Sequence, residues 1–100
     1  MEIKVEIYQN KMVLIEGSNS VTVTPNEPFT TTRLLVGTFL PAANCLEDGL
    51  KQIGAKGIFK SKPILKIEAR EMSEGGLSEV EERCLTEMGY QAGARKVEIC

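Results

Sequence analysis

The sequence contains few of the side chains that catalyse reactions or bind transition metals. Its 100 residues include no histidine, so it lacks the commonest general base and the commonest neutral metal ligand. This composition excludes serine-protease-type catalysis and histidine-zinc sites. The three cysteines, Cys45, Cys84 and Cys100, are an odd number without a Cys-x-x-Cys pair, which favours reduced thiols over a disulfide framework or a zinc site. We expect Cys45 and Cys84 to be small apolar core residues on helices and Cys100 to be exposed.

Two neighbouring motifs are candidates for anion binding or for a reactive carboxylate. Gly75-Gly76 precedes a predicted helix, and the free N-terminal amides of a helix favour anions. However, Glu74, Glu79 and Glu81 crowd the same end and would repel a phosphate, so a flexible loop is the favoured interpretation. Ser78 and Glu81 also have the Ser-x-x-Glu spacing of a capping box, in which each side chain accepts a hydrogen bond from the other residue's backbone N–H. Capping is favoured over catalysis for both residues.

The charge balance argues against binding to nucleic acid or to an anionic membrane. There are 12 Lys plus Arg and 14 Asp plus Glu, a net charge of −2, so no basic surface is predicted. Two segments remain as candidate contact surfaces. One is residues 30–33, Thr-Thr-Thr-Arg, and the other is residues 56–62, where three lysines surround Ile58 and Phe59. For the second segment, a loop whose apolar pair packs under the sheet is the favoured interpretation.

No segment of the sequence predicts membrane insertion or export. The longest apolar runs are four residues or fewer, whereas a spanning helix needs about 20. The residues after Met1 alternate as in a strand and do not form a signal sequence. We therefore expect a cytoplasmic protein.

Hydrophobic periodicity predicts a first half made of strands. Ile3, Val5 and Ile7 alternate with polar residues, as in a half-buried strand, and turn residues separate this run from two further β-branched runs. Pro25 and Pro28 then interrupt the ladder, because proline cannot donate a backbone hydrogen bond. The predicted strands are residues 2–8, 12–16, 21–24 and, optionally, 33–37.

The second half alternates helices and strands. Pro41 suits the first turn of a helix, and apolar residues recur at helical spacing as far as Ile53, with Gly54 or Gly57 as the stop. A second apolar stripe predicts a helix that stops near residues 89–93. The members of that stripe are Leu77, Val80, Cys84, Leu85 and Met88. The predicted elements are a helix at about 41–54, a strand at 63–69, the second helix and a strand at 96–99.

This order predicts a single α/β domain over residues 1–100, with one mixed α+β sheet. Its topology, β-β-β-(β)-α-β-α-β, resembles the ribonuclease H-like fold, in which parallel strands extend the sheet beyond the first strand and helices flank it. In nucleases of that fold, carboxylates on the first strand, first helix and fourth strand hold two Mg²⁺ ions. The positions that this resemblance implies are Glu6, Glu47 or Asp48, and Glu68 or Glu71. Because Glu6 lies among the alternating charges of a polar strand face, a solvated surface is favoured.

Three segments resemble the first domain of the bacterial actin homologue MreB, an actin-like protein. They are residues 63–67 (PILKI), 77–83 (LSEVEER) and 92–99 (AGARKVEI). Residues 17–20 and 26–28 are similar to that family's first phosphate-binding loop and the Asn-Glu-Pro after it. The resemblance implies a Mg-nucleotide site and a water-activating role for Glu81. Residues 16–19, Glu-Gly-Ser-Asn, depart from the family's Asp-x-Gly-Thr loop, and its second phosphate loop and second domain are missing, so no cofactor is expected.

The favoured hypothesis is a non-catalytic domain that acts by protein association, including homodimer formation, without a cofactor or metal. An exposed strand edge, at residues 22–24 or 97–99, would supply the interface by strand addition. Two alternatives stay open. One is a small-molecule-binding module with an apolar pocket lined by Leu46, Leu50, Leu65 and Met88. The other is a vestigial Mg-nucleotide-binding or nuclease-like enzyme.

Overall fold

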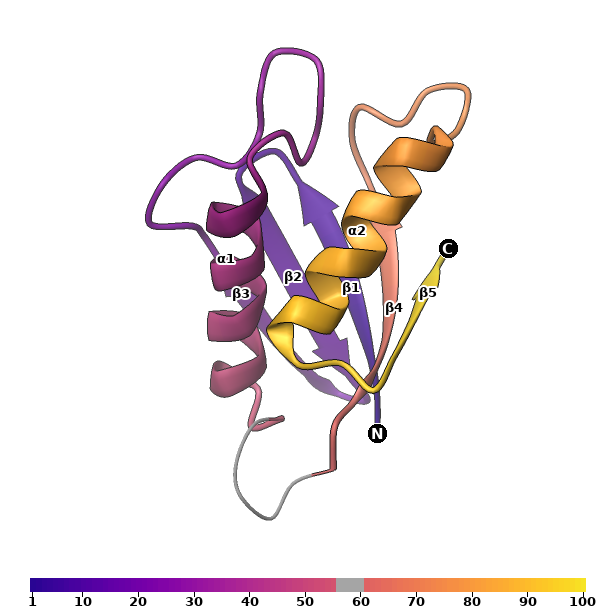
Figure 1. Cartoon of the computed structure of the whole chain (residues 1–100). Helices are drawn as coiled ribbons and strands as arrows, with labels where there is room; N and C mark the ends of the chain where they lie inside the picture. The colour runs from indigo at the N-terminus through magenta and orange to yellow at the C-terminus, as the bar shows by residue number, and fades with distance from the viewer. Residues whose placement is uncertain (56–60) are drawn as a thin grey trace.

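The computed structural model describes residues 1–55 and 61–100. Within this part of the chain, five strands form one mixed sheet in the order β3-β2-β1-β4-β5. Two helices lie side by side on one face of that sheet (Figure 1). The elements are β1 (Glu2–Tyr8), β2 (Lys11–Glu16), β3 (Asn19–Val23), α1 (Phe39–Gln52), β4 (Ile64–Ala69), α2 (Glu79–Ala92) and β5 (Lys96–Ile99). The predicted mixed α+β architecture is therefore confirmed.

The sheet combines an antiparallel and a parallel half. β1, β2 and β3 pair antiparallel, joined by tight turns in which Asn10 and Gly17 have positive φ angles of 50° and 57°; such turns match the twist of a hairpin. β4 pairs parallel with β1, and β5 pairs parallel with β4, because a helix carries the chain back to the same end each time. The parallel strands lie beyond β1, as predicted.

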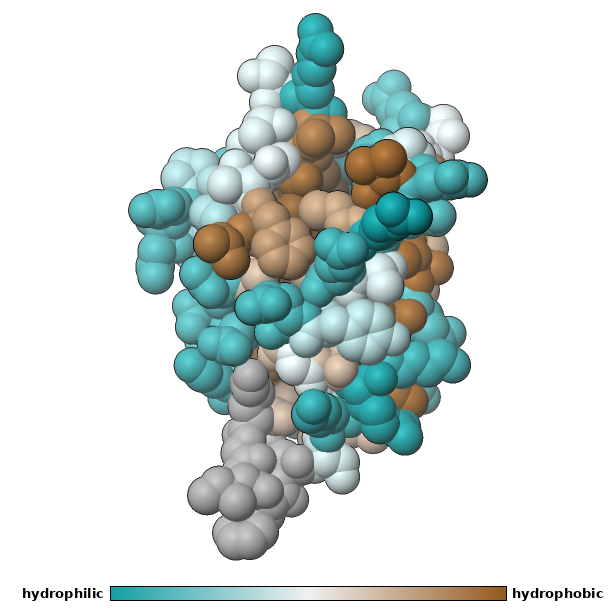
Figure 2. All heavy atoms as spheres, in the orientation of Figure 1, coloured by the Kyte–Doolittle hydropathy of each residue, from teal (hydrophilic) through white to brown (hydrophobic). Residues whose placement is uncertain are grey.

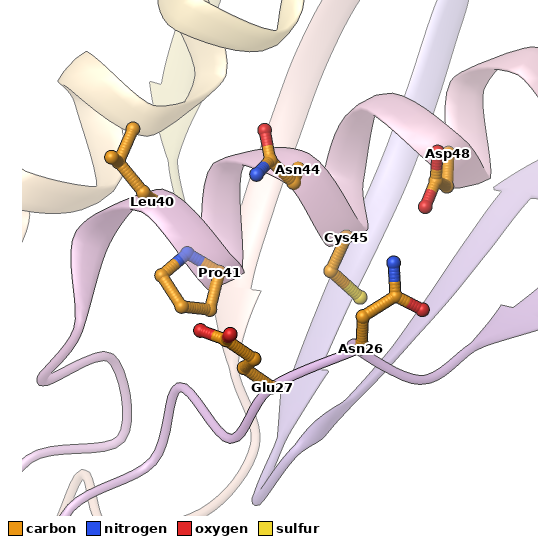
Figure 3. A pocket seen from close by; sticks show the side chains of 7 residues that line it. All are labelled: Asn26, Glu27, Leu40, Pro41, Asn44, Cys45 and Asp48. Atoms are coloured by element: carbon orange, nitrogen blue, oxygen red, sulfur yellow. The ribbon is translucent and has the colours of Figure 1, made fainter.

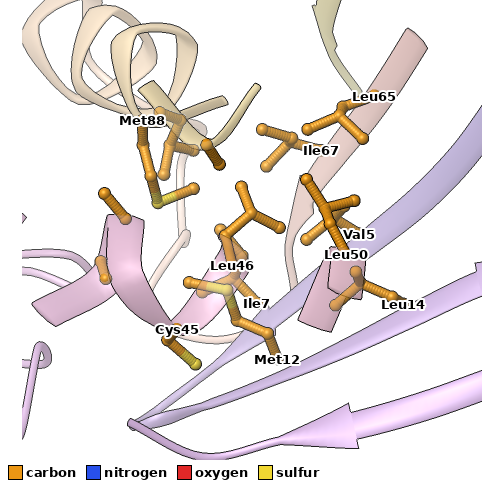
Figure 4. Packing of buried hydrophobic residues seen from close by; sticks show 14 of the residues in the cluster. Val5, Ile7, Met12, Leu14, Cys45, Leu46, Leu50, Leu65, Ile67 and Met88 are labelled. Atoms are coloured by element: carbon orange, nitrogen blue, oxygen red, sulfur yellow. The ribbon is translucent and has the colours of Figure 1, made fainter. Parts of the chain in front are cut away.

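The core fills the space between the sheet and the two helices. Ile3, Val5 and Ile7 of β1 are fully buried on the covered face, as their alternation predicts. Figure 4 shows side chains from both helices meeting those of the strands. No charged or polar residue is buried among the described residues. Neither of the two helices in this part of the chain is long and apolar enough to cross a membrane.

The predicted fourth strand at residues 33–37 is wrong, because this segment folds back on the loop before it. The Thr30 hydroxyl donates to the Leu35 carbonyl at 2.8 Å, and the Gly37 N–H donates to the Phe29 carbonyl at 2.8 Å. Local partners thus satisfy backbone groups that a strand would have to direct at the sheet. Phe29 is fully buried and belongs to the hydrophobic core, so its side chain anchors this loop to the core.

The helices form where they are predicted, with shifts of one or two residues at their ends. α1 begins at Phe39, after Thr38 in an extended conformation, so Pro41 lies within the first turn as expected. Gly54, at φ 82°, follows the end of α1. α2 ends at Ala92, and the next residue, Gly93, has a left-handed φ of 115°, which is the usual conformation of a glycine helix stop.

Val80 is the one member of the second apolar stripe that the structure places wholly outside the core. It is 78% exposed, and the prediction that it faces the core is wrong. At 100° per residue, Val80 lies about 140° around α2 from Leu85, which is buried. Leu77 precedes α2 and packs partly buried against the core, while Cys84 is half-buried.

Candidate functional site

The carboxylates that the ribonuclease H-like resemblance singles out do not converge. Glu6 and Glu68 are register partners on β1 and β4, on the open face of the sheet. Glu47 and Asp48 belong to α1, which packs on the opposite face (Figure 1). Glu71 accepts a hydrogen bond of 2.8 Å from a backbone N–H in the β1–β2 turn. In residues 1–55 and 61–100, no three His, Cys, Asp or Glu side chains lie close enough to hold a metal ion.

Two cations occupy the space between Glu6 and Glu68. The Lys4 Nζ atom lies 3.5 Å from a carboxylate oxygen of each residue. Arg70 Nη1 lies 2.8 Å from Glu68 Oε1 and 3.5 Å from Glu6 Oε2. The hydrogen bond from Arg70, assisted by the charge of Lys4, holds the pKa of the Glu68 carboxyl below its ordinary value. Side chains of the protein therefore neutralise these two carboxylates.

The ion pairs continue along the open face toward β5. Lys66 Nζ lies 2.9 Å from Glu2 Oε1. This contact lowers the pKa of Glu2 and raises the pKa of Lys66, to which the charge of Glu98 on β5 adds. The open face thus carries a network of opposite charges that reaches the last strand of the sheet.

Ser78 and Glu81 form the predicted capping box at the start of α2. Ser78 Oγ accepts from the Glu81 N–H at 3.2 Å, and Glu81 Oε1 accepts from the Ser78 N–H at 3.2 Å and from its hydroxyl at 2.9 Å. The Glu81 carboxylate is therefore engaged by the helix that carries it. Gly75 and Gly76 have φ angles of 77° and 88° and form part of the loop before this cap.

The two segments similar to a phosphate-binding region lie apart. Residues 17–18 form the turn between β2 and β3, whereas Asn26 and Glu27 follow β3 and line a groove against α1. The length of β3 separates them. A phosphate at either segment would meet only one of the two, which is too few converging amides for tight binding.

A groove beside α1 has a volume of about 330 Å³. Figure 3 shows its side chains, which come from the loop after β3 and from one side of α1. They are Asn26, Glu27, Leu40, Pro41, Asn44, Cys45 and Asp48. Burial, together with the smaller effect of the Asp48 charge, raises the pKa of the Cys45 thiol to about 11, so this thiol is protonated near neutral pH and is a poor nucleophile.

The apolar pocket predicted between the sheet and the helices has no opening at the residues expected to line it. Leu46, Leu50, Leu65 and Met88 are all fully buried and belong to the packed cluster of Figure 4. Their side chains fill the space that a ligand would need. The alternative of a ligand at these four residues therefore has no structural support.

Apolar side chains also reach the surface near the N-terminal ends of both helices, where Figure 2 shows hydrophobic residues gathered on the helix face. Leu40 and Val80 are 61% and 78% exposed. A hollow nearby, lined in part by Leu35 and Leu77, measures only about 20 Å³, roughly the space that one water molecule needs. This region offers no room for a small ligand.

Sequence reasoning missed the role of Asn10. Its Oδ1 atom accepts from the backbone N–H groups of Phe29 and Thr30 at 2.8 and 2.9 Å, and its own N–H donates to Thr30 Oγ1 at 2.9 Å. An asparagine in a tight turn is a signal for such a clamp, but its partners are 19 and 20 residues away. Thr30 belongs to the segment proposed as a contact surface, but its hydroxyl forms hydrogen bonds within the protein, with Asn10 and Leu35. Of the other proposed segment, residues 56–60 lie outside the described residues.

β3 and β5 are the two edge strands, in the places where exposed edges are predicted. The Cys100 N–H donates to the Ile67 carbonyl at 2.8 Å. Because backbone polar groups alternate in direction along a strand, Val97 and Ile99 direct theirs away from β4, toward the open edge. Lys96 and Glu98 are exposed, and they share the open face with Lys66, the register partner of Glu98.

Comparison with known proteins relates this chain to a protein of Escherichia coli. No protein-family model matches the chain. The uncharacterized protein YjaA of Escherichia coli (strain K12) is 30% identical over 89 residues, which cover 84% of this chain and 70% of YjaA. The chain belongs to the YjaA family. The name of YjaA states no activity.

Proposed function

We propose that this chain is a non-catalytic association domain of ribonuclease H-like and actin-like ancestry, which binds a protein partner by adding a strand to the edge of its sheet. The observation that carries the proposal is the β5 edge. Val97 and Ile99 present backbone donors and acceptors there, and they alternate along the strand with Lys96 and Glu98, whose side chains are exposed. Main-chain hydrogen bonds at such an edge provide affinity, and the alternating side chains provide specificity.

The strand order supports the proposed ancestry. β2 is antiparallel to all the other strands, and β4 and β5 extend the sheet beyond β1, as in the ribonuclease H-like arrangement that the sequence resembles. The three segments similar to MreB fall on β4, on the start of α2 and on the entry to β5. Fold alone does not determine activity.

The engagement of the candidate reactive groups supports a non-catalytic role. Lys4 and Arg70 neutralise Glu6 and Glu68, and the capping box holds Glu81. A carboxylate bound in this way is a weaker ligand for Mg²⁺, because the ion would first have to displace its present partners. The proposed domain therefore binds through its backbone edge and not through a charged cleft.

A peptide-display experiment tests the association. A random library of short linear peptides is selected against the chain, and the amide hydrogen exchange of the chain is then measured by NMR with and without the selected peptides. We expect slower exchange at Val97 and Ile99, the amides that a new strand would pair. Binders that protect only the helix face or the groove beside α1 would contradict strand addition at β5.

A nucleotide titration tests the non-catalytic part. Calorimetry with millimolar Mg-ATP, together with a phosphate-release assay, is expected to show neither binding heat nor hydrolysis. Saturable heat that disappears in Glu81→Gln, or in a Glu6→Gln and Glu68→Gln double variant, would favour the vestigial Mg-nucleotide or nuclease-like enzyme instead.

The groove beside α1 favours one second candidate, the binding of a small polar molecule. Its volume of about 330 Å³ is at the lower end of the range for ligand sites. Two amides and two carboxylates, of Asn26, Asn44, Glu27 and Asp48, line it, a set suited to a cationic amine. NMR titration with small primary amines and guanidines tests this candidate: shifts confined to these residues would support it, and their absence would remove it.

A further inference from the structure

We infer that the strand added at the β5 edge comes from a second copy of this chain, paired antiparallel about a two-fold axis at Val97. This inference rests on the proposed edge association and names its partner and its register. In a symmetric pair of this kind the two sheets join through β5, and each chain supplies the same surface to the other. Two features of β5 determine the register: the direction of its backbone polar groups and the charges of its exposed side chains.

The direction of the backbone N–H and C=O groups limits the possible registers. In an antiparallel ladder, two residues that exchange both hydrogen bonds must direct their N–H and C=O groups at each other. On β5 the residues that face the open edge are Val97 and Ile99, since Cys100 donates toward Ile67 of β4. Pairing two copies of β5 therefore sets Val97 against Val97, Val97 against Ile99, or Ile99 against Ile99.

The charges of Lys96 and Glu98 favour one of these registers. When Val97 faces Val97, Lys96 of each chain lies directly opposite Glu98 of the second copy, on the open face of the joined sheet. Directly opposed side chains have Cβ atoms about 4.5–5.5 Å apart, and opposite charges at this distance are favourable. When Val97 faces Ile99, the two Glu98 residues oppose each other, which is unfavourable. When Ile99 faces Ile99, Lys96 has no opposed residue on β5.

The charges of this register are available for an intermolecular contact. None of the ion pairs formed within residues 1–55 and 61–100 includes Lys96. Glu98 acts on Lys66, but the main partner of that lysine is Glu2, whose Oε1 atom accepts a hydrogen bond from Lys66 Nζ at 2.9 Å. In the joined sheet, Glu98 would lie between two lysines, Lys66 of its own chain, which is its register partner, and Lys96 of the second copy.

β5 is also held firmly enough to act as a template. Gly89 of α2 lies directly over Val97, where an added Cβ atom would come within 2.6 Å of Val97 Cγ2. The helix backbone thus packs closely on the strand and fixes its direction before a partner arrives, which lowers the ordering cost of pairing. Because the strand has only four residues, the interface is small and we expect a dissociation constant in the micromolar range.

Charge exchange tests the register by sedimentation equilibrium across micromolar concentrations. Lys96→Glu and Glu98→Lys each place like charges opposite each other twice, and each is expected to weaken the dimer by about 10-fold. The double variant Lys96→Glu with Glu98→Lys restores opposite charges and is expected to return the dissociation constant to within about 2-fold of the original. Arg83→Glu and Glu74→Lys are the matched controls, since they make the same charge changes at exposed positions away from β5.

A lysine on a strand edge can also serve to prevent association, and Lys96→Thr separates the two roles. The proposed dimer is weakened by this change, because Lys96 no longer attracts Glu98 of the second copy. If Lys96 only protects the edge, Lys96→Thr strengthens association, and the inference is overturned. Circular dichroism of each variant checks that the exposed substitution leaves the fold intact.

Zero-length carbodiimide cross-linking gives an independent readout. In a mixture of ¹⁵N-labelled and unlabelled chains, we expect a mixed-label peptide that joins Lys96 to Glu98, identified by mass spectrometry. A chain that stays monomeric, or a double variant that stays as weak as the single ones, overturns the inference. Peptides that still protect Val97 and Ile99 in a monomeric chain would leave the proposed edge association standing with a different partner, whereas the absence of both would overturn the two proposals together.

Discussion

The two faces of the sheet are stabilised by different physical effects. The covered face carries apolar side chains that meet α1 and α2, and residues such as Leu46 and Leu65 are fully buried there. The open face carries a ladder of ion pairs, such as Lys66 with Glu2 and Arg70 with Glu68. Burying a leucine contributes about 1.5–3 kcal/mol, whereas an exposed ion pair contributes about 0–1 kcal/mol. Stability is therefore concentrated on one face, which leaves the charges of the other to be exchanged at little cost.

The largest expected effect is the loss of a core side chain on the covered face. Leu46→Ala removes a fully buried leucine of α1 and leaves a cavity, so we expect the free energy of unfolding to fall by about 2–5 kcal/mol. Urea denaturation followed by circular dichroism measures this loss. Leu40→Ala is the matched control on the same helix, because Leu40 is 61% exposed and its truncation should change stability by less than about 0.5 kcal/mol. Equal losses for both variants would contradict the assignment of stability to the covered face.

A smaller effect is expected where α2 packs on the edge of the covered face. An added methyl group in Gly89→Ala would lie 2.6 Å from Val97 Cγ2, and such overpacking costs about 1–3 kcal/mol. The higher helix propensity of alanine offsets up to about 1 kcal/mol of this cost, so a net loss is expected in urea denaturation.

In the double variant Gly89→Ala with Val97→Ala, the Val97 methyl groups that the new alanine side chain would meet are absent. If the contact is the cause, its stability loss should be smaller than the sum of the two single losses. Simple additivity of the three measured values would show that the closeness of α2 to β5 does not limit the size of residue 89.

Local rules predicted most of the fold, and the failures have physical causes. The alternation of apolar and polar residues along β1 and the glycine that ends α2 are visible in the local sequence. The strand and the helix end that they predict are both confirmed. The false strand at residues 33–37 arose because the segment is apolar and Leu35 is buried in a loop, and apolar composition does not distinguish a buried loop from a strand. That loop depends on Asn10, a tertiary contact that no local pattern reveals.

For the candidate site, too, the features set by local sequence were predicted and those set by tertiary contacts were not. The capping role of Ser78 and Glu81 and the edge position of residues 97–99 follow from local sequence and element order, and both are confirmed. The groove beside α1 was not predicted, because it forms where Asn26 and Glu27 lie against a helix that begins twelve residues later. The prediction of a pocket failed because leucine and methionine side chains can either line a cavity or fill the space between elements. In this protein they fill it.

The helix cap lies at the rim between the two faces and is expected to have an intermediate effect. Ser78→Ala removes the hydroxyl that accepts from the Glu81 N–H, and loss of such a cap costs about 1 kcal/mol. Thermal and urea unfolding measure the change. Glu81→Gln keeps a side-chain oxygen that accepts from the Ser78 N–H, so it should retain most of the stability; a loss larger than that of Ser78→Ala would indicate a role for the Glu81 charge beyond the capping box.

The smallest effect is expected for Glu68 on the open face. Arg70 holds the pKa of Glu68 below its ordinary value, about 4.3 for a free glutamate. A carboxyl whose pKa is lower in the folded state adds stability above the ordinary pKa, and this contribution disappears as the pH falls through the lower, folded value. Because the pair is exposed, salt should screen it.

Glu68→Gln tests this pH dependence through urea denaturation at a series of pH values between neutral and strongly acidic, at low and high salt. We expect the variant to lose less stability than the original chain as the pH is lowered below about 4.3, and high salt to reduce the difference between the two. Glu74→Gln, in the loop before α2, is the control. An effect of Glu68→Gln as large as that of Leu46→Ala would mean that the ladder of ion pairs is a structural core in its own right, and the distinction between the two faces would fail.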